Sequence, residues 1–96
     1  MYKLHKSIQA EEDLTDIWIY TLQEWGVDQA DRYIDELEAG LARLESNPKL
    51  GRSREQLRRG YFSLRLNEHV AFYVVTASVI RIVRVLHSRM DPDRHL

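Results

Sequence analysis

Two amphipathic stripes separated by a short link constrain this chain more than any other feature. The first stripe runs from Leu14 to Trp25 and the second from Ala30 to Leu44, and in each the mostly apolar residues lie three and four positions apart. Gly26 lies between them and can adopt the left-handed conformation that ends a helix. Because so short a link makes two helices run antiparallel, the pattern predicts a helical hairpin whose stripes face a shared core.

The expected helix ends carry typical capping residues. Ser7 precedes the first helix, and its hydroxyl can accept a hydrogen bond from a free amide of the first turn. Asp28 is expected to cap the second helix in the same way. Asn47 precedes Pro48, and proline disfavours a helical conformation for the residue before it. The second helix is therefore expected to end there.

Segments that alternate between apolar and polar residues flank the hairpin. Residues 2–6 form one, and residues 61–66, 69–75 and 79–87 form three more with short links between them, which favours antiparallel pairing. Residues 49–60 are expected to form a loop, or a loop with one short turn. The predicted order is β-α-α-β-β-β. It describes a single α+β domain over residues 1–96, with the antiparallel helical hairpin packed on one face of a small, mainly antiparallel sheet.

The alternation also predicts which strand residues face the helices. An apolar set is expected beneath the hairpin: Phe62, Leu64, Leu66, Val70, Phe72 and Val74. The opposite set is expected on the uncovered face: Tyr61, Ser63, Arg65, His69, Ala71, Tyr73 and Val75. Both parities of residues 79–87 are largely apolar, which indicates either a central strand covered on both faces or a bulge that switches parity.

The last strand bears on where a partner would bind. If Ile80 and Ile82 face the helices, then Val83 and Val85 lie on the uncovered face near Tyr73. Apolar residues on an exposed face often mark a partner surface. The alternative is that residues 88–96 fold back over them.

Charge is segregated along the chain. Residues 1–48 carry four basic and eleven acidic residues, a net charge of −7, whereas residues 49–96 carry ten basic and four acidic residues, a net charge of +6. This asymmetry indicates a basic surface for an acidic partner, either nucleic acid or an acidic protein segment. The alternative is that acidic helices and a basic sheet attract each other within the fold.

Several features are absent. The chain has no cysteine, which fits a reducing cytoplasm and excludes disulfides. No apolar run suits a signal peptide or a membrane span, and the four histidines lack metal-ligand spacing. We expect no cofactor, no metal site and no membrane contact. Trp18 and Trp25 lie on the first stripe and are expected to pack in the core or between the helices.

Many short pieces of the sequence, in order along essentially the whole chain, match one family. They are residues 2–4, 10–17, 20–21, 25–30, 33, 44–48, 51–52, 69–73 and 83–91, with 95–96 at the end. On these residues the chain resembles the ParE branch of the RelE/ParE toxin superfamily. The resemblance implies a helical hairpin on a small antiparallel sheet, as the periodicity independently predicts.

The resemblance also implies a function. ParE-like proteins are the toxins of type II toxin–antitoxin systems, and they inhibit DNA gyrase by binding rather than as enzymes. A ParD-like antitoxin neutralises them by laying a helix and an extended segment on the toxin surface, and contact with DNA is then indirect, through the antitoxin. We expect antitoxin contacts at the uncovered face and the basic loop: Tyr61, Arg65, Tyr73, Arg81, Val83, Val85, Arg52 and Arg58. We expect target contacts in the tail: His87, Arg89, Met90, Asp91 and His95.

The sequence is also compatible with two other functions. The first is a RelE-like nuclease that cuts messenger RNA on the ribosome, for which Arg65, Arg81 and His87 could supply cations and an acid or base, with His69 and Tyr73 nearby. The C-terminal tyrosine typical of RelE-like nucleases is absent, and His87 can instead be structural, bonded to Asp91 or to backbone. The second is a non-toxic binding module derived from a toxin.

Overall fold

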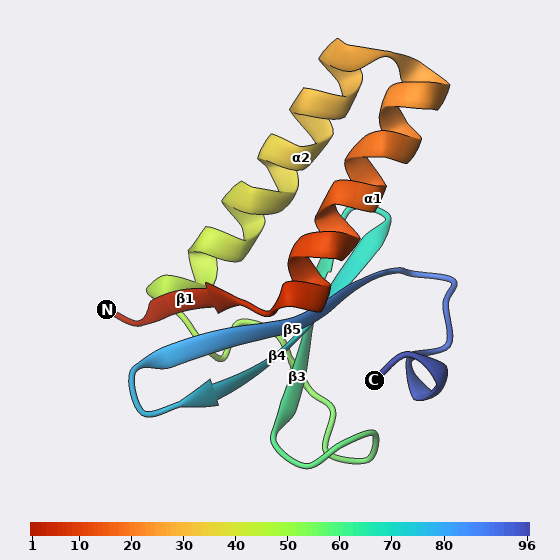
Figure 1. Cartoon of the computed structure of the whole chain (residues 1–96). Coiled ribbons are helices and arrows are strands. Elements are labelled where there is room, and N and C mark those ends of the chain that lie inside the picture. Colours follow the sequence, from red (N-terminus) through yellow and green to blue (C-terminus); the bar gives the residue numbers. More distant parts are fainter.

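The computed structural model describes residues 1–96 as two helices on a five-stranded sheet (Figure 1). The elements are β1 (Lys3–Lys6), α1 (Ile8–Trp25), α2 (Val27–Ala42), β2 (Arg52–Ser53), β3 (Tyr61–Leu66), β4 (His69–Thr76) and β5 (Val79–His87). Short 3₁₀ turns follow at Arg43–Glu45 and Pro92–Arg94. The sheet order is β1-β5-β4-β3-β2, with only β1 and β5 parallel. The predicted fold is confirmed, and the segment expected as a loop contains the two-residue strand β2.

The helix ends are set by Ser7 and Gly26. The Ser7 hydroxyl accepts from Ala10 N at 3.0 Å, as predicted, and donates to the Val83 carbonyl of β5 at 2.8 Å. Gly26 has a φ of 92°, which glycine adopts readily, and it is both the C-cap of α1 and the N-cap of α2. The expected cap at Asp28 is therefore wrong. The helices share one junction residue, and Asp28 already lies in the first turn of α2.

The core lies between the hairpin and one face of the sheet. Leu37, Leu41 and Leu44 are fully buried against Ile80 and Ile82 of β5. Each large aliphatic side chain buried in this way stabilises the fold by about 1.5–3 kcal/mol. The tip of the hairpin projects past the sheet, so the last turn of α1 and the first of α2 have no strand beneath them (Figure 1).

The sheet register corrects the predicted faces of β4. Leu66 pairs directly with His69 across the two-residue turn, so both side chains lie on the same face. The prediction was right for β3, whose Phe62, Leu64 and Leu66 pack toward the hairpin. It was wrong for β4, because the register puts His69, Ala71, Tyr73 and Val75 on the hairpin side and Val70, Phe72 and Val74 on the other.

A bulge in β5 decides its faces. Phe72 pairs with Arg84 but Tyr73 pairs with Ile82, so Val83 is an extra residue in β5. The residues of β5 that face the helices therefore change parity at Val83, which confirms the predicted alternative of a bulge. Val85 therefore lies under the hairpin, 3% exposed, and Tyr73 is fully buried. The expectation that Tyr73 and Val85 lie on the uncovered face is wrong. The Tyr73 hydroxyl instead donates to the Pro48 carbonyl at 2.9 Å and accepts from Gly51 N at 3.0 Å.

Candidate functional site

A cavity of about 620 Å³, which we call the hairpin cleft, lies between the hairpin, the ends of β4 and β5, and the C-terminal tail. Its walls include Tyr20 and Trp25 of α1 and Met90 of the tail, which are 64%, 72% and 40% exposed. The expectation that Trp25 packs in the core is wrong, because it lies at the projecting tip of the hairpin. Trp18 does pack between the helices, where Nε1 donates to Asp31 Oδ1 at 2.9 Å.

The floor of the hairpin cleft contains a tyrosine and two histidines. The Tyr33 hydroxyl accepts from Glu68 N at 3.2 Å and shares a second hydrogen bond with His69 Nδ1, 2.7 Å away. The His69 and His87 rings meet edge to face, with centroids 5.3 Å apart. Burial, with a further effect of the His87 charge, lowers the pKa of His69 from 6.5 to about 4, although Glu68 opposes this shift. His69 is therefore neutral near pH 7.

The residues considered for a nuclease are not brought together. His87 pairs with His69 on the hairpin side of the sheet, and its Nδ1 accepts from Arg89 N at 3.1 Å, which fits the expected structural role. Arg65 and Arg81 lie on the opposite face, paired with Val70 and Val74. Those two rows are four residues apart, or about 13 Å along the strands. The expected convergence of Arg65, Arg81 and His87 is wrong.

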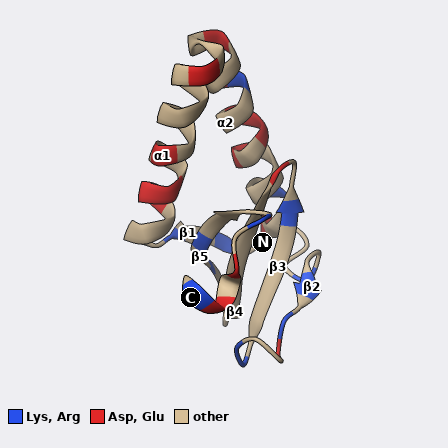
Figure 2. Ribbon diagram, turned by 90° about the vertical axis from the view of Figure 1, so that its right-hand side faces the viewer, with Lys and Arg blue, Asp and Glu red and all other residues tan.

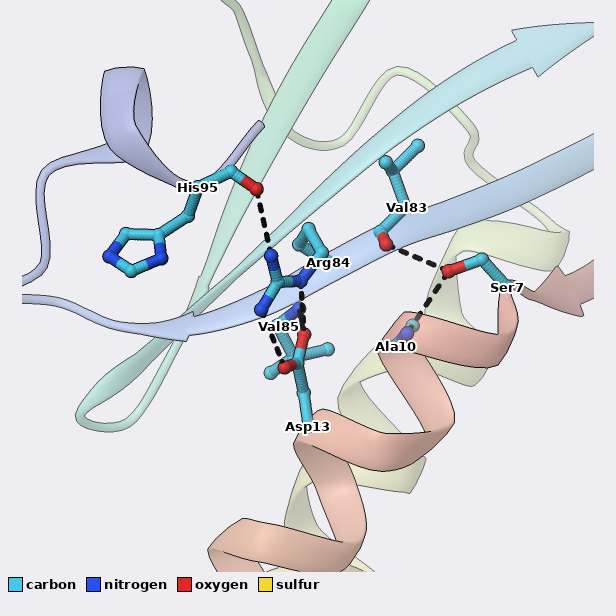
Figure 3. Close-up of polar contacts among 7 residues, drawn as sticks. All are labelled: Ser7, Ala10, Asp13, Val83, Arg84, Val85 and His95. Carbon is cyan, nitrogen blue, oxygen red and sulfur yellow. Dashed lines mark hydrogen bonds and ion pairs between the residues drawn. The ribbon is translucent and has the colours of Figure 1, made fainter.

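An ion pair that we call the Asp13–Arg84 clasp joins α1, β5 and the tail (Figure 3). Asp13 accepts from Arg84 Nε at 2.8 Å and Nη2 at 2.9 Å, and also from Val85 N at 2.9 Å. Arg84 Nη1 donates to the His95 carbonyl at 2.8 Å. The hydrogen bonds to Asp13 raise the pKa of Arg84. The clasp pairs the Val85 amide in the part of β5 that extends beyond β1, and no local sequence pattern pointed to it.

The tail folds back against the body of the protein, as the alternative expected, but not over an uncovered Val85, because the bulge places that residue beneath the hairpin. Arg84 binds the His95 carbonyl and Arg58 binds the main-chain oxygen of Leu96. Of the residues expected to contact the target, His87, Met90 and His95 line the hairpin cleft, whereas Arg89 and Asp91 are exposed tail residues.

The other candidate surface is the side of the sheet away from the helices, which we call the open sheet face. Phe72 and Leu86 face this side but are only 3% exposed. Its accessible part is formed by Tyr61, Val70, Val74, Arg65, Arg81 and Arg52, with Arg54 and Arg58 in the adjoining loop. Five of the eight residues expected to contact an antitoxin therefore lie here: Tyr61, Arg65, Arg81, Arg52 and Arg58. Val83 is the half-buried bulge residue, and Tyr73 and Val85 are buried on the other side.

Acidic and basic residues separate between the two layers (Figure 2). Asp and Glu are concentrated on the helices, and Lys and Arg on the strands and loops. Two ion pairs, Lys6 with Glu38 and Arg84 with Asp13, join a strand to a helix. Attraction within the fold thus involves two of the basic residues, and most of the arginines remain outside ion pairs.

The fold and these surfaces define a small α+β domain with two candidate binding surfaces, and comparisons identify its family. A family model described as the ParE toxin of the type II toxin–antitoxin system parDE matches residues 4–92. Toxin ParE1 from Mycobacterium tuberculosis is 46% identical over 88 residues, which is 91% of this chain and 90% of that protein. Toxin ParE1 from Caulobacter vibrioides is 42% identical, over 99% and 96% of the two chains.

A solved structure agrees at the level of the fold. A chain of the chromosomal ParDE TA system from P. aeruginosa superposes with a TM-score of 0.81 at 21% identity, covering 91% of this chain and 96% of that one. The chain belongs to the ParE toxin family of type II toxin–antitoxin systems. No helix of the structure is both long and apolar enough to cross a membrane.

Proposed function

We propose that this toxin arrests growth by binding DNA gyrase in the cytoplasm, without catalysis, and that a ParD-like antitoxin holds it inactive. Membership of the ParE family supports this proposal. So does the separation of Arg65 and Arg81 from His87 on opposite faces of the sheet, because acid–base catalysis needs groups within hydrogen-bond reach of one substrate.

The hairpin cleft is the surface that we assign to the helical part of the antitoxin. Tyr20, Trp25 and Met90 give it an apolar wall that is open to solvent, and grooves of this kind accept the apolar face of an amphipathic helix. Exposed large aromatic residues are also the side chains that most often dominate binding energy at an interface. This cleft is the single observation that carries the antitoxin part of the proposal.

The open sheet face is the surface that we assign to an extended, acidic part of the antitoxin. Arg52, Arg65 and Arg81 are exposed there, and Arg58 lies in the adjoining loop. A strand-like segment running over this face would pair carboxylates with these arginines. In the resulting complex, contact with operator DNA would be made by the antitoxin and only indirectly by the toxin.

The tail is the surface that we assign to the target. Met90 and His95 line the hairpin cleft, with Arg89 and Asp91 exposed beside it. An antitoxin helix in the cleft would therefore cover part of the target-binding surface. Neutralisation by such occlusion needs no change in the toxin fold.

Affinity for a ParD-like antitoxin tests this assignment. Trp25→Ala and Tyr20→Ala should each weaken binding by about 30-fold or more in calorimetry, as expected for an interface hot spot. Ile8→Ala is the matched control, because Ile8 is 78% exposed on the same helix but lies outside the hairpin cleft. Unchanged affinity of both aromatic variants, with circular dichroism showing native folding, would exclude the cleft as the helix site.

Growth measurements test the class of function. Induction of this gene alone should arrest growth, and co-expression of the antitoxin should restore it. Continued growth at full toxin expression would favour the non-toxic binding module. Toeprinting on translating ribosomes addresses the nuclease alternative, for which cleavage abolished by Arg81→Ala and His87→Ala would be the positive result.

A further inference from the structure

The open sheet face carries several basic side chains and almost no acidic ones. Arg52 pairs with Ser63 and Arg81 with Val74 in the register of the sheet. Neither arginine takes part in an ion pair. Arg65 faces Glu68 at 3.6 Å, but the two side chains are 60% and 66% exposed, so solvent screens the pair strongly. These arginines therefore remain available to an anionic partner.

Arg54 adds a partly buried cation near the middle of this face. Its guanidinium lies 5.8 Å from the centroid of the Phe72 ring, and Nη1 donates to Ser63 Oγ at 3.3 Å. Its Nε is buried and has no hydrogen-bond partner. A guanidinium with an unpaired donor can still take an acceptor oxygen of a bound anion.

We propose that the open sheet face binds the phosphate backbone of duplex DNA directly when no antitoxin covers it. The planar donor fork of arginine matches two phosphate oxygens, and the face supplies this group from β2, β3 and β5. Arg52 and Arg81 lie on strands three positions apart and two residues out of register, so their Cα atoms are about 16 Å apart. Their long side chains can reach from there to phosphates on the two sides of the DNA major groove, which is about 12 Å wide.

The floor of the open sheet face favours a duplex over a single strand. Between the arginines it presents Val70 and Val74, and Tyr61 is its only aromatic side chain that is not buried. Binding of single strands relies on aromatic rings on which successive bases stack, and one half-buried tyrosine gives no such platform. Contacts to the backbone alone predict binding without sequence preference.

Charge segregation orients the toxin for this contact. The helices on the opposite side of the sheet are acidic, so a nearby polyanion attracts the sheet and repels the hairpin (Figure 2). The hairpin cleft and its exposed aromatic residues would then point away from the DNA. This inference requires neither gyrase nor a particular antitoxin, so it goes beyond the proposed function.

Fluorescence anisotropy with a labelled duplex of about 20 base pairs tests the proposal. For four phosphate contacts, the logarithm of the binding constant should fall with the logarithm of the salt concentration with a slope of about −3.6. Affinity should therefore drop about 100-fold between about 50 mM and 200 mM salt. Arg52→Ala/Arg81→Ala should reduce the magnitude of the slope by about two and weaken binding about tenfold. Arg32→Ala/Arg43→Ala is the control, because it removes equal charge from exposed positions outside the sheet.

The outcomes separate the alternatives. Selective loss of duplex binding in the open-face variant, with the control unchanged, supports the proposal. Equal losses in both variants would indicate only a general effect of net charge and overturn it. Tighter binding to single-stranded DNA or RNA of the same length would also overturn it. Failure to bind any duplex at low salt would overturn it as well. In that case, binding of an acidic peptide that depends on Arg52 and Arg81 would identify the face as a protein-docking surface.

Discussion

Single side chains differ widely in how much structure they hold together. Asp13 accepts three hydrogen bonds, two from Arg84 and one from the Val85 amide, and the side chains of the pair are only 13% and 18% exposed. Arg65 forms one long ion pair with Glu68 in solvent. Removing one partner of a buried pair leaves the other charge buried and uncompensated, whereas a surface pair contributes little.

Arg84→Ala should therefore lower the free energy of unfolding by about 3–5 kcal/mol. Arg65→Ala, the same substitution in a surface pair, should lower it by less than about 1 kcal/mol. Urea unfolding followed by circular dichroism measures both. Similar small losses in the two variants would show that the Asp13–Arg84 clasp does not stabilise the fold.

His69 should make stability depend on pH. Its pKa is about 4 in the folded protein and about 6.5 when unfolded, so the unfolded chain binds the proton first as pH falls. The stability associated with neutral His69 is present above about pH 6.5 and is lost as the pH falls toward 4. Because the ring is only partly buried, we expect this loss to be about 1–2 kcal/mol.

The measurement compares wild type with His69→Gln. Carboxylates titrate in the same range in both proteins, so the informative quantity is the difference between their unfolding free energies at about pH 7 and pH 4.5. The advantage of the wild type at the higher pH should shrink by about 1–2 kcal/mol at the lower pH. A pH-independent difference would show that His69 titrates normally in the folded state.

At the scale of the elements, contact between α2 and β3 depends on a glycine. A Cβ on Gly40 would overlap with Leu66 Cδ2. Glycine inside a helix normally destabilises it by about 1 kcal/mol relative to alanine. A side chain at this position would therefore require Leu66, which is only 7% exposed, to change its conformation within the core.

Gly40→Ala should destabilise the protein by about 1–3 kcal/mol through overpacking, despite the better helix propensity of alanine. The exposed neighbour on the same helix supplies the control, because Ala39→Gly should cost about 1 kcal/mol by propensity alone. Thermal unfolding of both variants measures the two effects. A Gly40→Ala protein more stable than wild type would show that α2 can move away from β3 without penalty.

An element could be predicted when residues close together in the sequence determine it. Both helices and the strands β1, β3, β4 and β5 have local periodicity and were predicted. The parity of β4 was also available, because a two-residue turn makes Leu66 and His69 neighbours on one face, although the apolar pattern of Val70, Phe72 and Val74 pointed the other way. Val83 gave no signal of its position, since both parities of β5 are apolar.

The candidate sites were harder to predict from the sequence than the fold was. Asp13 and Arg84 are 71 residues apart in the chain, so only the three-dimensional fold brings them together. Trp25 belongs to the same stripe as the buried Leu14, and its exposure depends on how far the hairpin extends past the sheet. The arginines of the open sheet face were identified from charge and alternation, which are local properties.

At the scale of the whole molecule, the toxin presents two different surfaces on opposite sides of the sheet. The hairpin cleft has an apolar wall and is bounded by the tail, and the open sheet face is basic. The Asp13–Arg84 clasp fixes α1, β5 and the tail relative to one another, so it sets the shape of the cleft (Figure 3). A ParD-like antitoxin that uses both surfaces would cover the tail residues assigned to the target.

A supercoiling assay with purified gyrase, relaxed plasmid and ATP tests whether gyrase is the target. Free toxin should stop supercoiling and cause cleaved plasmid to accumulate, and prior mixing with the antitoxin should abolish both effects. Unchanged supercoiling at saturating toxin, with no cleaved DNA, would contradict gyrase as the target.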